Sequence, residues 1–208
     1  MFSEELLSVF NIRRMTGSSF EFAKRYHPHL VSYMGKYRIL ETPERLAAFM
    51  ATIRVESAGL QSVEEGLYYK DPLRLATLFR RVFDVNKNKR IDQDDIDAAK
   101  PYARNPAGLS KILYNGYHGR GLIQLTWLSN YQAFSNASGV DCVNEPDLLL
   151  EPEYATHSAC WFFETRGCNK AADSGTMDNV TRIVNPAMLH RMERNAAYAE
   201  ALAVLASL

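Results

Sequence analysis

The chain has 208 residues, of which 47% are hydrophobic and 23% are charged, a balance typical of a globular domain. Its 24 basic and 24 acidic side chains cancel, so no overall electrostatic field attracts the chain to nucleic acid or to anionic lipid. No apolar run approaches the about 20 residues that span a bilayer. We therefore expect a single domain over residues 1–208, monomeric, with no nucleic-acid partner and no membrane insertion.

The N-terminus and the cysteines indicate in which cellular compartment the protein is made. Glu4 and Glu5 lie where a secretory signal peptide would carry basic residues and then an uninterrupted apolar core. We therefore expect no signal peptide, and synthesis in a cytoplasm. The cysteines are odd in number and lack C-x-x-C spacing, so we expect small buried residues instead of disulfide partners or zinc ligands. They are Cys142, Cys160 and Cys168.

Most of the chain has helical periodicity, with start signals such as Thr42-Pro43, a capping residue before a proline. Strand-like alternation is scarce, and residues 122–126 are the best strand candidate. We expect a mainly α fold with a very small β element near residues 120–127 and a small helical lobe over residues 70–113. The expected helices span residues 18–35 (disturbed by Pro28), 43–57, 71–83, 92–103, a short segment from 105, a segment through 131–134, a segment from 151 through the Trp-Phe-Phe run, 176–185 and 189–206.

The helix that begins at Pro43 ends its apolar stripe with a glutamate. Its large apolar side chains recur every three or four residues on one face, and Glu56 continues that face. A carboxylate on a buried face loses hydration, which raises its pKa. A glutamic acid that keeps its proton near neutral pH can protonate a leaving oxygen. The alternative is an ordinary glutamate at a helix end, which reaches solvent or pairs with Arg54.

A second pair of carboxylates, Glu64 and Glu65, follows in a loop. A loop of this length can return a carboxylate opposite the first one. Two carboxyls about 6.5–9.5 Å apart suit hydrolysis with inversion, in which one is the acid and the other activates water. Tyr68 and Tyr69 offer flat surfaces for sugar rings. The alternative is a solvated acidic turn.

Residues 119–131 combine glycines with polar side chains. Gly119 and Gly121 permit close approach of the backbone. If residues 122–126 are extended, Gln124 and Thr126 point to the same side and offer an amide and a hydroxyl for a sugar and a water. The alternative is a core strand whose polar side chains bond to the backbone.

Several segments, in this order, resemble the family 19 chitinases and, more closely, the phage endolysins of that family. The segments are R-V-E-S-A-G (54–59), E-E-G-L-Y-Y (64–69), Y-H-G-R-G-L-I-Q-L-T-W-L-S-N-Y (117–131), E-Y-A-T-H-S-A-C-W-F-F (153–163) and I-V-N (183–185). The resemblance covers roughly residues 20–205. It implies a lysozyme-like helical fold and an inverting hydrolase that cuts a β-1,4 bond in an N-acetylhexosamine polymer, with no cofactor for catalysis.

The resemblance also implies roles for individual residues. Glu56 matches the general acid, Glu65 the general base, and Thr126 the hydroxyl that positions the attacking water. The residues expected to bind substrate are Tyr69, Arg120, Gln124, Asn130, Tyr131, Asn185 and Arg194, the last of them near the base. The departures from the family pattern are Val55 in place of a histidine, Tyr68 in place of a frequent asparagine, and Pro186-Ala187 in place of two glycines.

The segment F-D-V-N-K-N-K-R-I-D-Q-D-D-I contains an EF-hand-like loop over residues 84–95. Its donor positions carry oxygen atoms, and amphipathic helices flank it. Lys89 stands where glycine is preferred, and the last position is an aspartate instead of a glutamate. The expected ligands of a structural Ca²⁺ are Asp84, Asn86, Asn88, Arg90 through its carbonyl, and Asp95, with Asp92 at position nine. The alternative is a polar connector between helices.

These observations lead to one functional expectation. We expect a phage endolysin that hydrolyses the bond between N-acetylmuramic acid and N-acetylglucosamine in bacterial peptidoglycan. It would stay in the host cytoplasm until holin pores release it to the periplasm and the cell wall. The alternatives are a chitinase of the same family, a lytic transglycosylase that uses one glutamate, and a non-catalytic, calcium-dependent wall-binding protein.

Overall fold

The computed structural model describes residues 4–208, and in them the chain forms helices joined by loops. No β-strand forms in this range, where isolated bridges join Glu64 to Arg120 and Arg120 to Leu125. The expected mainly α class is confirmed. The elements are η1 (Glu4–Leu7), α1 (Val9–Thr16), α2 (Phe20–Lys36), η2 (Ile39–Glu41), α3 (Pro43–Glu56), α4 (Pro72–Leu78), α5 (Arg80–Phe83), α6 (Gln93–Ala99), η3 (Lys100–Tyr102), α7 (Pro106–Tyr114), α8 (Leu128–Ser138), η4 (Pro146–Leu150), α9 (Pro152–Thr165), α10 (Cys168–Ala172), α11 (Met177–Val184) and α12 (Arg191–Ala206).

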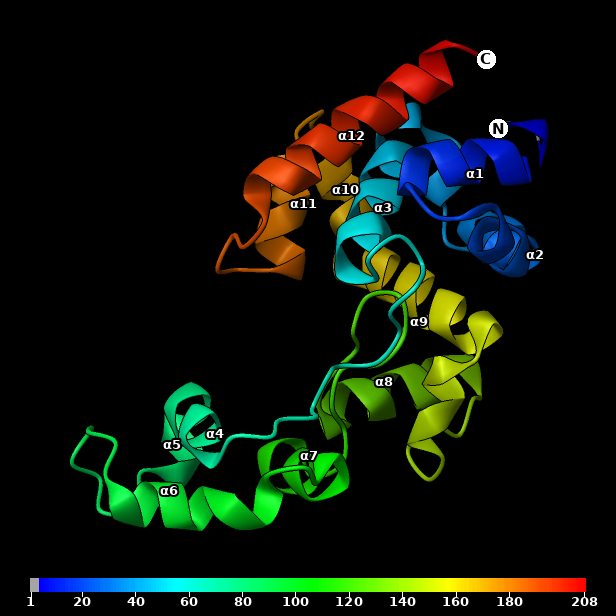
Figure 1. Ribbon diagram of the computed structural model, residues 1–208. Coiled ribbons are helices and arrows are strands. Elements are labelled where there is room, and N and C mark those ends of the chain that lie inside the picture. Colours follow the sequence, from blue (N-terminus) through cyan, green and yellow to red (C-terminus); the bar gives the residue numbers. More distant parts are fainter. Residues whose placement is uncertain (1–3) are drawn as a thin grey trace.

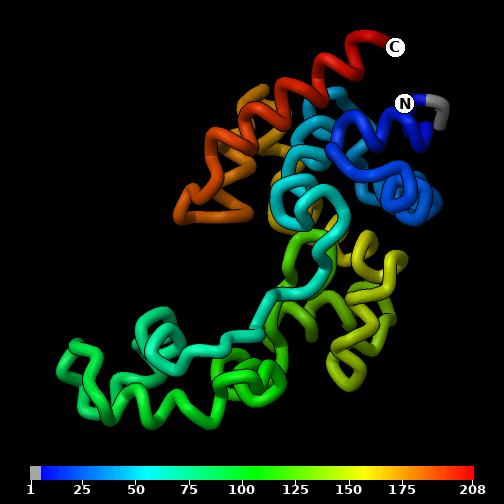
Figure 2. Tube along the Cα trace, in the orientation of Figure 1, coloured from blue at the N-terminus to red at the C-terminus, as the bar shows by residue number. Residues whose placement is uncertain are grey.

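The helices gather at two ends of the molecule. Helices α1 to α3 and α10 to α12 lie at one end, α4 to α7 lie at the other, and α8 and α9 lie between them (Figure 1). The trace in Figure 2 follows the chain from α3 into the distant end and back through α8. One hydrophobic cluster surrounds α3, a second lies in the α4–α7 end around Leu75, Phe83 and Leu109, and a third joins α8 to α9 around Phe134.

Helix α3 is the centre of the largest cluster. Every side chain from Leu46 to Ile53 is fully buried, so the helix is enclosed on all sides, as in the core of a larger protein. Small side chains such as Ala47 and Ala51 permit close packing by α1 and α12. The hydroxyl of Thr52 donates to the carbonyl of Ala48 at 2.8 Å, so this buried polar group has a partner. This enclosure fixes the position of the helix end that carries Glu56.

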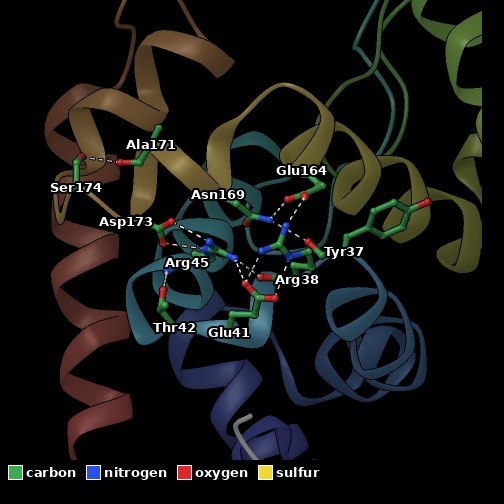
Figure 3. Close-up of polar contacts among 10 residues, drawn as sticks. All are labelled: Tyr37, Arg38, Glu41, Thr42, Arg45, Glu164, Asn169, Ala171, Asp173 and Ser174. Atoms are coloured by element: carbon green, nitrogen blue, oxygen red, sulfur yellow. Dashed lines mark hydrogen bonds and ion pairs between the residues drawn. The ribbon is translucent and has the colours of Figure 1, made fainter.

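Ion pairs hold the opposite end of α3 (Figure 3). Thr42 caps the helix by accepting from the backbone N–H of Arg45 at 3.2 Å. The guanidinium of Arg45 donates to both carboxylate oxygens of Asp173, after α10, at 2.7 and 2.8 Å, and also to Glu41. Glu41 in turn accepts from Arg38 at 2.8 and 3.2 Å. Because the Arg45 pair with Asp173 is bidentate, it fixes orientation as well as distance.

Some local expectations differ from the structure. Helix α2 runs through Pro28 without interruption, and neither α1 nor α10 was expected. The expected strand is wrong, because residues 120–125 form a tight turn. The N–H of Arg120 donates to the carbonyl of Leu125 at 3.1 Å, and that of Leu125 donates back at 2.8 Å. The chain reverses because Gly121 and Gln124 take left-handed φ values of 81° and 55°, a conformation that residues other than glycine adopt rarely.

Two further expectations concern the cysteines and the membrane. All three cysteines are free and buried, as expected. In the described range no helix is both long enough and apolar enough to cross a bilayer.

Candidate active site

Glu56 is the last residue of α3, and its carboxylate pairs with an arginine. The side chain of Arg194, on α12, is 1% exposed, that of Glu56 is 17% exposed, and Nη2 of the arginine contacts Oε1 of the glutamate. Arg54, the partner proposed in the alternative interpretation, pairs with Glu200 on α12 instead. The apolar surroundings expected for Glu56 are therefore replaced by a buried ion pair, and Arg194 lies at the expected acid, not near the expected base.

The position of Arg194 depends on the loop before α12. Its Nε donates to the carbonyl of Leu189 at 3.2 Å, and the N–H of Leu189 reaches the side-chain oxygen of Asn185 at 3.5 Å. The remaining nitrogen, Nη1, is buried without a hydrogen-bond partner among the described residues. Asn185 is thus linked to Arg194 through the backbone of Leu189, and no hydrogen bond joins it to Glu56 or Glu65 within residues 4–208.

Glu65 lies in the extended segment between α3 and α4, where two donors hold its carboxylate. The hydroxyl of Tyr114, at the end of α7, donates to Oε1 at 2.7 Å, and the backbone N–H of Gly119 donates to Oε2 at 3.0 Å. The N–H of Glu65 donates to the carbonyl of Gly119 at 2.9 Å. Each carboxylate oxygen therefore accepts one hydrogen bond, and the two bonds fix the orientation of the carboxylate.

Tyr114 is suited to remain a donor. Burial raises the pKa of its hydroxyl, and the hydrogen bond to Glu65 raises it further. Its ring packs edge-on against Trp127 with centroids 5.1 Å apart, which fixes the ring as well as the hydroxyl. Nothing in the sequence indicates that Tyr114 meets Glu65, since the two are 49 positions apart.

The side chains of Gln124 and Thr126 and the carboxylate of Glu65 all lie against Gly119. A β-carbon added at Gly119 would lie 2.9 Å from Oε1 of Gln124 and 3.3 Å from Oγ1 of Thr126, so the two side chains pack closely on this glycine. The same glycine donates to Glu65. The Thr126 hydroxyl donates to the carbonyl of Gln124 at 2.8 Å, and the Asn130 amide donates to the carbonyl of Thr126 at 2.8 Å. The structure thus gathers four of the expected site residues around one glycine.

Glu64, the neighbour of Glu65, has different surroundings. Its side chain is 53% exposed, and it accepts from Nε2 of His118 at 3.1 Å. Nδ1 of the same histidine lies 2.6 Å from the hydroxyl of Ser110 on α7. His118 is nearly buried, so this chain of contacts holds the glycine-rich loop against α7. Sequence reasoning missed both His118 and Ser110, because the contacts join segments that only the fold brings together.

Arg120 and Tyr131 support the loop from inside. The guanidinium of Arg120 donates to the hydroxyl of Tyr131 and to the carbonyl of Gly116, each at 3.1 Å, and pairs with Asp147 at 2.9 Å. Tyr131 is fully buried, and its hydroxyl donates to the carbonyl of His118 at 2.7 Å. Tyr131 therefore holds the loop from within the core, and Arg120, 6% exposed, shares this role while it also lines the pocket beside Glu65.

Two aromatic residues follow Glu65, and a pocket lies beside them. Tyr69 is partly buried, edge-on to Phe79 in the α4–α7 end at 5.7 Å, which leaves part of its surface for a ligand. Tyr68 is 58% exposed. A pocket of about 590 Å³ lies against Glu65 and Tyr68, and Glu56 is not part of its lining.

The EF-hand-like loop, between α5 and α6, has its expected ligands arranged around it. The carboxylate of Asp84 accepts from the N–H groups of Asn88 and Lys89 at 3.0 Å each, and the amide oxygen of Asn88 accepts from the N–H of Arg90 at 2.7 Å. Lys89, in place of the expected glycine, takes a φ of 62°. The loop thus makes its sharp turn despite the substitution.

The side chains in the loop also bind one another. The amide groups of Asn86 and Asn88 donate to Asp92 at 2.7 and 3.0 Å. Asp95 is fully buried and accepts from the N–H groups of Val85 and Asp92. Residues 4–208 contain no group of three or more His, Cys, Asp or Glu side chains gathered as metal ligands. A cation here would therefore depend on amide and carbonyl oxygens together with Asp84 and Asp95.

Comparison with known proteins places the chain in a family. The profile described as chitinase class I matches residues 88–194. A "Glycosyl hydrolase family 19 domain-containing protein" of Haemophilus influenzae is 30% identical over 153 residues, which are 67% of this chain and 69% of that protein. Chitinase 8 of Oryza sativa subsp. japonica is 49% identical over 63 residues, 30% of this chain and 24% of the chitinase. The chain therefore matches only about a quarter of the length of this plant relative.

Solved structures with a similar fold agree with this family. The crystal structure of a bacterial family 19 chitinase superposes with a TM-score of 0.66 and 19% sequence identity, covering 96% of this chain and 95% of that one. At this identity the superposition speaks for the fold alone. With the profile and the Haemophilus relative, it leads to one conclusion: the chain belongs to glycoside hydrolase family 19, the class I chitinases.

Proposed function

We propose that the protein is an endolysin that hydrolyses the β-1,4 bond between N-acetylmuramic acid and N-acetylglucosamine in peptidoglycan, with inversion. The observation that carries the hydrolytic part is the double hydrogen bond that holds Glu65 beside Thr126 and Gln124. The peptidoglycan part rests on the likeness of residues 54–59, 64–69 and 117–131 to phage endolysins. The phage origin, and holin-mediated release from a host cytoplasm, belong to the same proposal.

The proposed reaction divides the work between two carboxylates. Glu65, ionised and oriented by Tyr114 and Gly119, accepts a proton from a water that the Thr126 hydroxyl helps to hold. That water attacks the anomeric carbon while Glu56 protonates the departing glycosidic oxygen. The ion pair with Arg194 holds the Glu56 carboxylate at the end of α3, where this proposal places the acid.

A chitinase is the second candidate function. This candidate is supported by the relatives that are named as chitinases, which are 44–50% identical to segments of this chain. Both candidates use the same two carboxylates, so substrate choice is what separates them. Mass spectrometry of digested sacculi, run beside chitin oligomers, distinguishes the two. Products with 1,6-anhydro-muramic ends would instead indicate a lytic transglycosylase.

The glutamates give the most direct mutational test. Glu56→Gln and Glu65→Gln should each lower the hydrolysis of purified sacculi by about 10²- to 10⁴-fold, because each removes a proton-transfer group. Glu64→Gln is the matched control, because Glu64 adjoins Glu65 in the chain and its exposed side chain contacts His118 and no other hydrogen-bond partner among residues 4–208. It should retain most activity. Circular dichroism checks the fold of each variant.

The Glu64→Gln control also shows which of the two neighbouring glutamates is the base. If Glu64→Gln were inactive and Glu65→Gln active, the base would be Glu64. If both Glu56→Gln and Glu65→Gln kept full activity, the proposed reaction would be wrong.

Tyr114 supplies a second prediction. Tyr114→Phe removes one of the two donors to Glu65, and a hydrogen bond to a charged group contributes about 1.5–3 kcal/mol. We expect kcat to fall by about 10- to 100-fold, because the carboxylate loses one of the two bonds that orient it. The control is Tyr117→Phe, whose hydroxyl donates to the carbonyl of Val143 at 3.1 Å, away from Glu65. An unchanged kcat in Tyr114→Phe would mean that the hydroxyl does not act on the base.

We also propose that residues 84–95 bind a structural Ca²⁺ that stabilises the turn between α5 and α6. Support comes from the oxygen-rich spacing and from Asp95, a fully buried carboxylate that accepts from the N–H groups of Val85 and Asp92. For binding, the amides of Asn86 and Asn88 must turn their oxygens inward, away from the present contacts with Asp92.

The calcium proposal is tested by thermal unfolding. Millimolar Ca²⁺ should raise Tm, because a ligand that binds only the folded chain stabilises it, and EDTA should reverse the gain. Asn86→Ala with Asn88→Ala should abolish the gain and leave the Tm in EDTA near that of the wild type. Equal Tm values with Ca²⁺ and with EDTA in the wild type would exclude a calcium site that contributes to stability.

A further inference from the structure

A strongly basic surface lies on the segment of residues 70–90, which we call the basic tip. It holds seven of the chain's 24 basic residues but only two of its 24 acidic ones, Asp71 and Asp84. All seven basic side chains are exposed. They are Lys70, Arg74, Arg80, Arg81, Lys87, Lys89 and Arg90. The zero net charge of the whole chain therefore hides a local excess of positive charge.

Four aspartates follow the basic tip along the chain, Asp92, Asp94, Asp95 and Asp97, and offset part of its charge. None of the seven side chains forms an ion pair with another residue in the described range. Asp71 caps α4 by accepting from the N–H of Leu73 at 2.9 Å, and Asp84 accepts from two backbone N–H groups of its loop. Helix α6, which packs on α4, carries exposed Asp94 and Asp97, and Asp97 pairs with Lys100.

Exposed aliphatic side chains lie among these cations. Leu73, Leu78, Val82 and Val85 are 48%, 54%, 38% and 53% exposed. Leu78 and Val82 line a shallow pocket of about 330 Å³ together with Arg80 and Arg81, so charge and apolar surface meet in one place. Figure 1 shows α4, α5 and the following loop at the end of the molecule farthest from α12. Apolar side chains rimmed by charged ones, as in this pocket, are a feature of interaction sites.

We propose that the basic tip docks on an anionic lipid surface. Guanidinium and ammonium groups contact lipid phosphates, while Leu78, Val82 and their aliphatic neighbours enter the boundary between headgroups and acyl chains. The aliphatic side chains favour a lipid surface over a soluble polyanion, which offers them nothing to bury against. The chain lies on the bilayer in this arrangement and does not span it. The inference does not depend on the proposed reaction, since it uses no residue of the candidate active site.

Vesicle flotation with the full chain tests the proposal. Wild-type protein should float with vesicles that contain phosphatidylglycerol and remain unbound with vesicles of phosphatidylcholine alone, and added salt should release it. Arg80→Glu with Arg81→Glu should abolish flotation. Leu78→Ser with Val82→Ser, which leaves the charge unchanged, should weaken it at least several-fold.

The control removes the same charge elsewhere. Arg13→Glu with Arg14→Glu alters basic residues of α1, at the opposite end of the molecule. This control should float like the wild type, and circular dichroism should show that every variant is folded. The proposal is overturned if wild type does not bind anionic vesicles, or if the α1 control loses binding equally. It is also overturned if the Leu78 and Val82 variant binds as well as wild type, in which case the tip recognises polyanions in general.

Discussion

The candidate site depends on the pair of hydrogen bonds that holds the carboxylate of Glu65. Tyr114 donates from the end of α7 and Gly119 donates from the glycine-rich loop, so each oxygen has one partner. Two buried hydrogen bonds hold the loop itself. The Ser110 hydroxyl bonds to the ring of His118, and the Tyr131 hydroxyl donates to the carbonyl of His118. Gly119 is the meeting point, because Gln124 and Thr126 pack closely on it while its N–H donates to Glu65. The polar core beneath the loop therefore fixes the geometry of the candidate site.

The second carboxylate, that of Glu56, is held by an ion pair instead of by neutral hydrogen-bond donors. Glu56 ends a helix that is buried on every side, and Arg194 from α12 reaches it through the packed interior. Removing either member of a buried ion pair leaves an uncompensated charge, which is strongly destabilising. The two carboxylates thus differ in how they are held: two neutral donors hold Glu65, and a buried guanidinium holds Glu56.

Local signals allowed much of the helical fold to be predicted from the sequence. Thr42-Pro43, Asp71-Pro72 and Glu151-Pro152 each precede a helix in the structure, because capping and proline preferences act within one turn. The segment at residues 122–126 was misjudged, since its apolar residues are buried in a turn with left-handed backbone at Gln124, not in a strand. The prediction that Gln124 and Thr126 lie together remained useful although the strand was wrong, because both side chains lie against Gly119.

Contacts between distant segments could not be predicted in this way. Arg194 was expected near Glu65 and lies instead at Glu56, 138 positions away in the chain. Tyr114, His118 and Ser110 carried no signal of their own, because their roles come from the packing of α7 against the loop. The basic tip could not be predicted from the net charge, because the basic and acidic residues of the whole chain are equal in number.

The central claim is that two carboxylates act on opposite faces of one sugar ring. Proton NMR of the first product formed from a soluble, peptide-free glycan oligomer measures this directly, because it reports the anomer before mutarotation. Cleavage of a β-1,4 bond with Glu65 activating water should give the α-anomer first. Initial appearance of the β-anomer would mean retention through a covalent or equivalent intermediate, and would contradict the proposed roles of Glu56 as acid and Glu65 as base.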